Sequence, residues 1–97
     1  MRFDGYRLTP LAEADLEEIW LYSLHKWSLE QAHRYIHDVI DTFEGLKEGS
    51  KRGRKTDIRA GYFKYAVGSH VIYFREQGRD LLIVRILHGR RDVRRHL

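Results

Sequence analysis

The segment from His88 to Leu97 holds the side chains of this 97-residue chain that are best suited to phosphate chemistry. An imidazole can give or take a proton near neutral pH, and guanidinium groups stabilise the negative charge of phosphates and carboxylates. His88 ends an apolar run, and four arginines follow it: Arg90, Arg91, Arg94 and Arg95. This spacing is compatible with cleavage of a phosphodiester and with binding of an acidic partner.

Cleavage requires a complete acid–base set around this segment. A ribonuclease could use His88 as general acid or base, with Arg85 and Arg90 stabilising a pentacovalent phosphate. No second acid–base group is evident, because Glu76 alternates onto the buried side of its strand and Asp92 lies beyond the strand that ends at His88. Because basic clusters bind more often than they cleave, we predict a protein that is not an enzyme and has no catalytic residues. Catalysis through His88 is the alternative.

Two basic segments could hold nucleic acid by electrostatic attraction. One is the loop Lys51–Lys55, and the other is the run Arg90–Arg95. No helix-turn-helix, zinc-finger or RNA-recognition signature accompanies them. We therefore expect no sequence-specific DNA binding by this chain alone.

One pair of histidines has a spacing that a metal ion could bridge. His33 and His37 stand four residues apart on a predicted helix, off its apolar stripe. A zinc site needs further fixed ligands, and the chain has no cysteine to supply them. We expect no metal and no cofactor.

The two halves of the chain carry opposite net charge. Residues 1–48 contain 5 lysines and arginines against 10 acidic residues, a balance of −5, and residues 49–97 contain 13 against 4, a balance of +9. A positive surface of this kind attracts nucleic acid or an acidic protein, and composition does not choose between them.

Length and composition predict one globular domain over residues 1–97. Hydrophobic residues make up 42% of the chain and charged residues 33%, as in ordinary folded proteins. No apolar run is long enough to span a membrane, and no signal-peptide core opens the chain. Together with the absence of cysteine, these features predict a cytoplasmic protein without membrane contact.

A short strand over residues 3–8 and two antiparallel helices are predicted in the first half. Thr9-Pro10 is typical of a helix start, and Ser28 begins a Ser-x-x-Gln capping box that starts a second helix at once. Gly45 and Gly49 are expected to mark the end of that second helix. Its apolar stripe consists of Leu29, Ala32, Tyr35, Ile36, Val39, Ile40, Phe43 and Leu46.

The second half predicts an antiparallel meander of three strands. They cover Tyr62–Val67, His70–Glu76 and Leu81–Leu87, with turns at Gly68-Ser69 and Gln77-Gly78. The expected fold class is therefore α+β, with one sheet and the helices on one of its faces.

Alternation along these strands sorts their side chains onto two faces. The face expected to pack on the helices consists of Phe63, Tyr65, Val67, Ile72, Phe74, Leu82, Val84 and Ile86. The other face is apolar with cations and tyrosines, and only the basic tail remains to cover it. Such a face suits an acidic amphipathic segment of another protein, although a solvated sheet face is the alternative. The residues predicted to bind that segment are Lys64, Tyr73, Arg75, Leu81, Ile83, Arg85 and Leu87.

Leu21 and Leu24 lie off the apolar face of the first helix. They are either two scattered surface leucines or a patch for a partner or a second copy of the chain.

Several short stretches, taken together, resemble the ParE-type toxins of bacterial toxin–antitoxin modules. They run in order along almost the whole chain: Tyr6-Arg7-Leu8-Thr9-Pro10, Ala14-Asp15-Leu16, Ile19-Trp20, Trp27-Ser28, Ile58-Arg59-Ala60-Gly61-Tyr62, Gly68-Ser69-His70-Val71-Ile72-Tyr73-Phe74-Arg75 and Ile83-Val84-Arg85-Ile86-Leu87-His88-Gly89-Arg90-Arg91-Asp92. One departure is Phe63-Lys64 after Gly61-Tyr62, where relatives often carry arginines.

The resemblance implies a small α+β toxin encoded beside a ParD-like antitoxin. In this family the antitoxin binds operator DNA, its acidic C-terminal segment wraps the toxin, and the two form a hetero-oligomer. Freed toxins of the family poison DNA gyrase, whereas RelE-type relatives cut messenger RNA on the ribosome. The chain lacks a clear set of the lysine, arginine and tyrosine positions typical of RelE, which favours the gyrase branch. The expected target-binding residues are Arg90, Arg91, Arg94, Arg95, Leu21 and Leu24. A non-toxic basic binding module is a third alternative.

Overall fold

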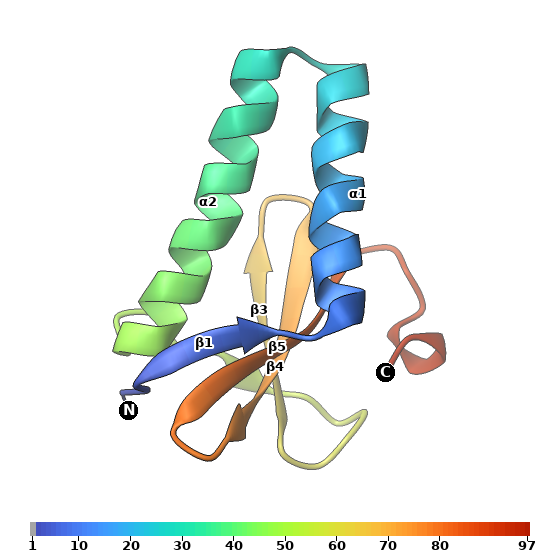
Figure 1. Ribbon diagram of the computed structural model, residues 1–97. Coiled ribbons are helices and arrows are strands. Elements are labelled where there is room, and N and C mark those ends of the chain that lie inside the picture. The colour runs from blue at the N-terminus through green and yellow to red at the C-terminus, as the bar shows by residue number, and fades with distance from the viewer. Residues whose placement is uncertain (1) are drawn as a thin grey trace.

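The computed structural model describes residues 2–97, in which two antiparallel helices cover one face of a five-stranded sheet (Figure 1). The strand order is β1-β5-β4-β3-β2, with β1 parallel to β5 and every other pair antiparallel. This architecture confirms the α+β class. The elements are β1 (Gly5–Leu8), α1 (Pro10–Lys26), α2 (Leu29–Glu48), β2 (Arg54–Lys55), β3 (Tyr62–Val67), β4 (His70–Gln77), β5 (Asp80–His88) and the 3₁₀ turn η1 (Val93–Arg95).

Both helices begin at the residues that the sequence predicts. The Thr9 hydroxyl accepts a hydrogen bond from the Ala12 N–H at 3.0 Å, and Ser28 accepts one from the Gln31 N–H at 3.1 Å. The end of α2 differs in one detail, because Gly45 lies inside the helix. Only Gly49 is the cap, with φ of 88°, a left-handed conformation that glycine adopts without strain.

The sheet combines the strand predicted over residues 3–8 and the predicted meander with one further strand, β2. β1 adds a parallel edge, and it begins at Gly5 because the Phe3 N–H bonds to the Lys47 carbonyl of α2 at 2.9 Å. Two residues of the basic segment predicted as a loop form β2, which pairs with β3 as the other edge. The turn between β4 and β5 is Gly78-Arg79, one residue later than expected.

A β-bulge changes which side chains of β5 face the helices. Phe74 pairs with Ile83, but the preceding Tyr73 pairs with Arg85, so Val84 has no partner and the alternation shifts by one residue. The prediction that Leu81 and Ile83 lie on the open face is therefore wrong. Both are fully buried in the core, and Leu82 and Val84, expected in the core, are only partly buried.

The core lies between the helix hairpin and the sheet. Its fully buried centre combines α2 with the middle strands: Val39, Phe43, Ile72, Leu81 and Ile83. Tyr6 of β1 packs against Phe43 with ring centroids 5.5 Å apart. The far half of the hairpin projects beyond the strands, so its tip has no sheet to pack on (Figure 1). Within residues 2–97, no helix combines the length and the apolar character that crossing a membrane requires.

Candidate functional site

The face of the sheet turned away from the helices carries a cationic groove. Cross-strand pairs place Arg54, Lys64 and Tyr73 in one row, with Val71 and Ala66 in the next. The groove has a volume of about 600 Å³. It contains three cations and no acidic side chain, and its lining is Arg52, Arg54, Lys64, Tyr65, Ala66, Val71, Tyr73 and Gly89. An acidic chain laid there would meet only positive or neutral groups.

The residues predicted to bind an acidic partner differ in how accessible they are. Lys64 is exposed and Arg75 is partly exposed, so both can reach a partner. Tyr73 and Leu87 lie on the open face but are only 7% and 2% exposed. Burial raises the pKa of the Tyr73 phenol. The accessible apolar groups beside the cations are Val71, Leu82 and Val84.

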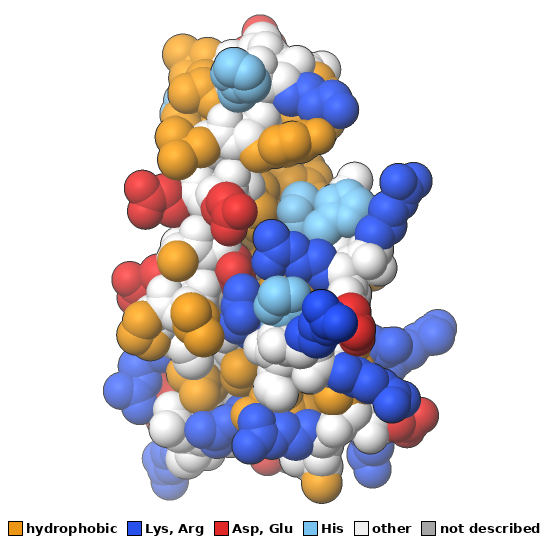
Figure 2. Space-filling model, turned by 90° about the vertical axis from the view of Figure 1, so that its right-hand side faces the viewer, with side chains coloured by type: hydrophobic (Ala, Val, Ile, Leu, Met, Phe, Trp, Pro, Cys, Tyr) orange, Lys and Arg blue, Asp and Glu red, His pale blue; other side chains and the backbone are white. Residues whose placement is uncertain are grey.

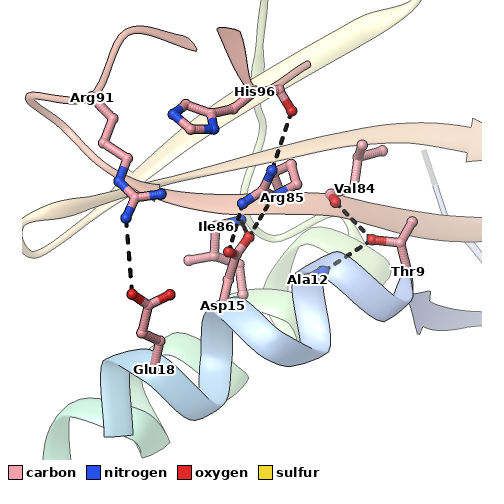
Figure 3. A network of polar contacts seen from close by, with 9 residues as sticks. All are labelled: Thr9, Ala12, Asp15, Glu18, Val84, Arg85, Ile86, Arg91 and His96. Carbon is pink, nitrogen blue, oxygen red and sulfur yellow. Dashed lines mark hydrogen bonds and ion pairs between the residues drawn. The ribbon is translucent and has the colours of Figure 1, made fainter. Parts of the chain in front are cut away.

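Arg85 is already bound within the chain (Figure 3). Its Nε and Nη2 atoms donate to the two carboxylate oxygens of Asp15 in α1, at 2.7 and 2.8 Å. The side chains of Arg85 and Asp15 are 11% and 6% exposed. The hydrogen bond with Asp15 raises the pKa of Arg85. The Arg85 guanidinium is therefore not free to bind an acidic partner.

Asp15 also binds the backbone of β5 beyond the point where its pairing with β1 ends. The Ile86 N–H donates to its Oδ2 at 2.9 Å. Six residues earlier, the Thr9 hydroxyl donates to the Val84 carbonyl at 2.7 Å, and the Thr9 N–H to the Ile83 carbonyl at 3.0 Å. The start of α1 thus supplies the hydrogen bonds that a longer β1 would have made.

The basic tail after β5 folds back over the strand and ends in η1. Asp92 caps this turn by accepting from the Arg94 N–H at 3.1 Å. Glu18 of α1 lies 3.9 Å from the Arg91 guanidinium, and the Arg85 Nη1 donates to the His96 carbonyl at 3.4 Å. The remaining arginines of the tail, Arg90, Arg94 and Arg95, are exposed, and basic side chains gather around this end of the molecule in Figure 2.

A second cleft, of about 270 Å³, lies between α1 and the end of the β4–β5 ladder. It brings His88 together with His70, since the two residues pair across the ladder with ring centroids 5.5 Å apart. The Tyr35 hydroxyl lies 2.7 Å from His70 Nδ1. Burial, followed by the nearby His88, lowers the pKa of His70. The cleft is lined by Asp15, Glu18, Ile19, Tyr22, His70, Ile86, His88 and Arg91.

The tip of the helix hairpin exposes large apolar side chains. Leu21 and Leu24 are 55% and 38% exposed, and their neighbours Tyr22, Trp27 and Leu29 are exposed as well. We call these five residues the tip patch. Orange side chains gather at the upper end of the face in Figure 2. Of the two histidines spaced four residues apart on α2, His33 packs edge-on against Trp20 with ring centroids 4.9 Å apart.

Two residues of these sites were not recognised from the sequence. Asp15 is buried on the same helical face as Ala12 and Ile19. An acidic residue inside an apolar stripe, matched with Arg85 inside an apolar strand, is the signal that could have found the pair. His70 could have been found by counting back from the β4–β5 turn, but only with the bulge included.

Comparisons with known proteins agree with this fold. The family described as "ParE toxin of type II toxin-antitoxin system, parDE" matches residues 6–93. A protein named Toxin ParE1 from Caulobacter vibrioides is 41% identical over 93 residues, covering 95% of this chain and 96% of its own length. A Toxin ParE1 from Mycobacterium tuberculosis is 38% identical over 94 residues, with the same coverage.

Solved structures show the same fold at lower sequence identity. A chain from the chromosomal ParDE system of P. aeruginosa superposes with a TM-score of 0.77 at 22% identity, covering 87% of this chain and 94% of its own. A chain of the RelBE2 toxin–antitoxin complex from Mycobacterium tuberculosis gives 0.63 at 19% identity, covering 91% and 93%. The family match over most of the chain and the close relatives confirm the resemblance found in the sequence: this chain belongs to the ParE toxins of type II toxin–antitoxin systems.

Proposed function

We propose that this toxin arrests growth by binding DNA gyrase without catalysing a reaction, and that a ParD-like antitoxin neutralises it. The antitoxin's acidic amphipathic segment lies across the open face of the sheet, and the resulting hetero-oligomer contacts operator DNA only through the antitoxin. Because gyrase acts in the cytoplasm, the toxin works there. Support for an antitoxin partner comes from the toxin–antitoxin systems to which both solved relatives belong.

The observation that carries the antitoxin assignment is the cationic groove. Its three positive side chains have no acidic neighbour in the lining, so their charge is free to attract carboxylates. The partly exposed Val71, Leu82 and Val84 offer apolar surface beside Lys64 and Arg75. These five residues replace the predicted set, because Leu81 and Ile83 are buried in the core and Arg85 is paired with Asp15. An antitoxin segment that folds on binding can offset its ordering cost by burying this surface.

Charge reversal in the groove tests this assignment. We expect Lys64→Glu with Arg54→Glu, two exposed cations of the groove, to weaken binding of the cognate antitoxin about 100-fold, since each reversal replaces attraction by repulsion. Isothermal titration calorimetry measures the affinity, and falling affinity with rising salt supports an electrostatic contact. Arg79→Glu is the matched control, because Arg79 is exposed at the β4–β5 turn outside the groove. Equal affinity for the groove variant and the control would remove the open face from the proposal.

The target-binding part of the proposal rests on the tail and the tip patch. Arg90, Arg94 and Arg95 extend into solvent, and Leu21 and Leu24 are exposed where the helices have no sheet beneath them. Deleting residues 90–97 should abolish both growth arrest and inhibition of gyrase supercoiling by the purified toxin. Leu21→Ser with Leu24→Ser tests the tip patch in the same assays. Full inhibition by the deletion variant would exclude the tail as the contact.

A ribonuclease remains the second candidate, because His70 lies beside His88 and could act as its acid–base partner. His70 and His88 share one cleft with Arg91, so two imidazoles and a guanidinium could flank a phosphodiester. His70→Ala and His88→Ala should then each abolish messenger RNA cleavage on the ribosome. If the wild-type toxin blocks supercoiling and leaves translation intact, this candidate is excluded.

A further inference from the structure

Helix α1 reaches the C-terminal tail at two points, through acidic residues one turn apart. Asp15 binds Arg85, and Arg85 in turn donates to the His96 carbonyl at 3.4 Å. Glu18 lies 3.9 Å from Arg91. Figure 3 shows the Asp15–Arg85–His96 contacts and the Glu18–Arg91 contact side by side above the same face of α1. The tail is therefore tied to the helix both near its start and near its end.

In the inner contact, all three nitrogens of the Arg85 guanidinium donate a hydrogen bond. Two nitrogens of Arg85 bind the Asp15 carboxylate side-on, at 2.7 and 2.8 Å, and the third nitrogen points to the tail. Asp15 itself is fixed by the Ile86 N–H at 2.9 Å. A lysine has a single nitrogen on a flexible stem and cannot hold the carboxylate and the tail carbonyl in this planar arrangement.

The tail has little structure of its own to hold it. After His88 it contains one turn, in which the Arg91 N–H bonds to the His88 carbonyl at 2.9 Å, and the three-residue η1; the Gly89 N–H bonds to the Ser69 carbonyl at 2.9 Å. So short a turn is not stable in isolation. The two contacts from α1 therefore decide whether the exposed arginines are presented in a fixed arrangement.

We propose that Arg85 is a positioning residue, oriented by Asp15, that holds the tail in the conformation in which Arg90, Arg94 and Arg95 meet the target. Glu18 is the second anchor, through Arg91. This inference rests on the proposed function of the tail. Fixing the tail before it binds reduces the entropy lost on binding, so the loss of either anchor weakens the toxin without removing a contact to the target.

The test combines tail mobility with toxicity in the variants Arg85→Lys and Glu18→Gln. Heteronuclear ¹⁵N NOE values of residues 89–97 report tail motion directly, and the 11.6 kDa chain is suited to this measurement. We expect both variants to lower these values, Arg85→Lys at Asp92–Leu97 and Glu18→Gln around Arg91. About tenfold more toxin should then be needed for the same growth arrest. Arg79→Lys, at an exposed arginine, is the control and should change neither measurement.

The outcomes separate this inference from the proposed function. Tail NOE values that stay at the wild-type level in Arg85→Lys overturn the inference, as does a mobile tail with undiminished growth arrest. If Arg85→Lys does not fold, Glu18→Gln decides, because Glu18 is exposed and its removal leaves the buried pair intact. Growth arrest by the chain lacking residues 90–97 overturns the tail's role in target binding, and the NOE measurement still tests the two anchors.

Discussion

Arg75 and Arg85 stand on neighbouring strands and belong, by cross-strand register, to the same face of the sheet, yet their surroundings are opposite. Arg85 lies on β5 next to α1, where two of its nitrogens donate to Asp15 and its side chain is 11% exposed. Arg75 lies on the open face, and its hydrogen bond goes to the carbonyl of the next residue, Glu76, at 3.3 Å. A cation in an apolar strand therefore indicates a partner, and only the fold shows whether that partner is internal or another molecule.

The largest expected effect on stability comes from removing Asp15, which binds both Arg85 and the backbone of β5. Asp15→Ala leaves a buried guanidinium without its counter-ion and the Ile86 N–H without an acceptor. Removal of one member of a buried ion pair costs about 3–5 kcal/mol. We expect a loss of this size in the free energy of unfolding, measured by urea denaturation.

Two further variants sharpen this result. Arg75→Ala, on the open face, should change the free energy of unfolding by less than about 0.5 kcal/mol. Asp15→Leu combined with Arg85→Met should recover much of the stability, because an apolar pair replaces a buried ion pair at little cost. If Asp15→Ala lowers the free energy of unfolding by less than about 1 kcal/mol, the Asp15–Arg85 pair contributes little to holding α1 against β5.

The two helix caps offer a smaller comparison along the same line. Thr9 caps α1 and also donates to the Val84 carbonyl on the edge of β5, whereas Ser28 is exposed at the hairpin tip and only caps α2. We expect Thr9→Ala to cost about 2 kcal/mol and Ser28→Ala about 1 kcal/mol in urea denaturation. Equal losses would mean that the contact of Thr9 with β5 contributes nothing beyond the cap.

The smallest effect concerns His70, which is half-buried at the far end of the β4–β5 ladder. Burial and the neighbouring His88 lower its pKa below the ordinary value of 6.5. At a pH between the lowered pKa of His70 in the folded chain and its ordinary pKa in the unfolded chain, the unfolded chain binds more protons. Stability therefore falls as pH drops below about 6.5. We expect thermal melting between pH 7.5 and 5.5 to show this loss.

A matched pair of variants isolates the histidine in that experiment. His70→Gln should flatten the pH dependence of the melting temperature, whereas His37→Gln, at an exposed position of α2, should leave it unchanged. The same acid sensitivity in both variants would assign the effect to other groups.

Local signals in the sequence predicted most of the fold. Thr9-Pro10 and Ser28 specify helix starts through hydrogen bonds to residues three positions away, so they can be recognised without tertiary context. The glycine-containing turns predicted the meander for the same reason. β1 pairs with residues more than seventy positions later, and no local pattern indicates such a parallel partner.

The site was harder to predict, because it depends on one residue of register. The unpaired Val84 exchanges the faces of Leu81 and Leu82 and of Ile83 and Val84, which changed the predicted partner surface. Arg85 was predicted to bind the acidic segment of another protein, but its acidic partner lies within the chain. That partner is Asp15, seventy residues away on α1, and sequence distance gave no indication of it.

The edges of the sheet affect how readily the toxin aggregates once it is free of its antitoxin. In residues 2–97 one outer strand is β2, only two residues long and made of Arg54 and Lys55. At the other side, Thr9 and Asp15 occupy the backbone groups of β5 that β1 leaves uncovered. Neither edge of the sheet offers a long, uncharged strand with which a strand of a second molecule could pair. Such pairing is how many small β-containing proteins aggregate. A liberated molecule should therefore stay dispersed while it searches for its target.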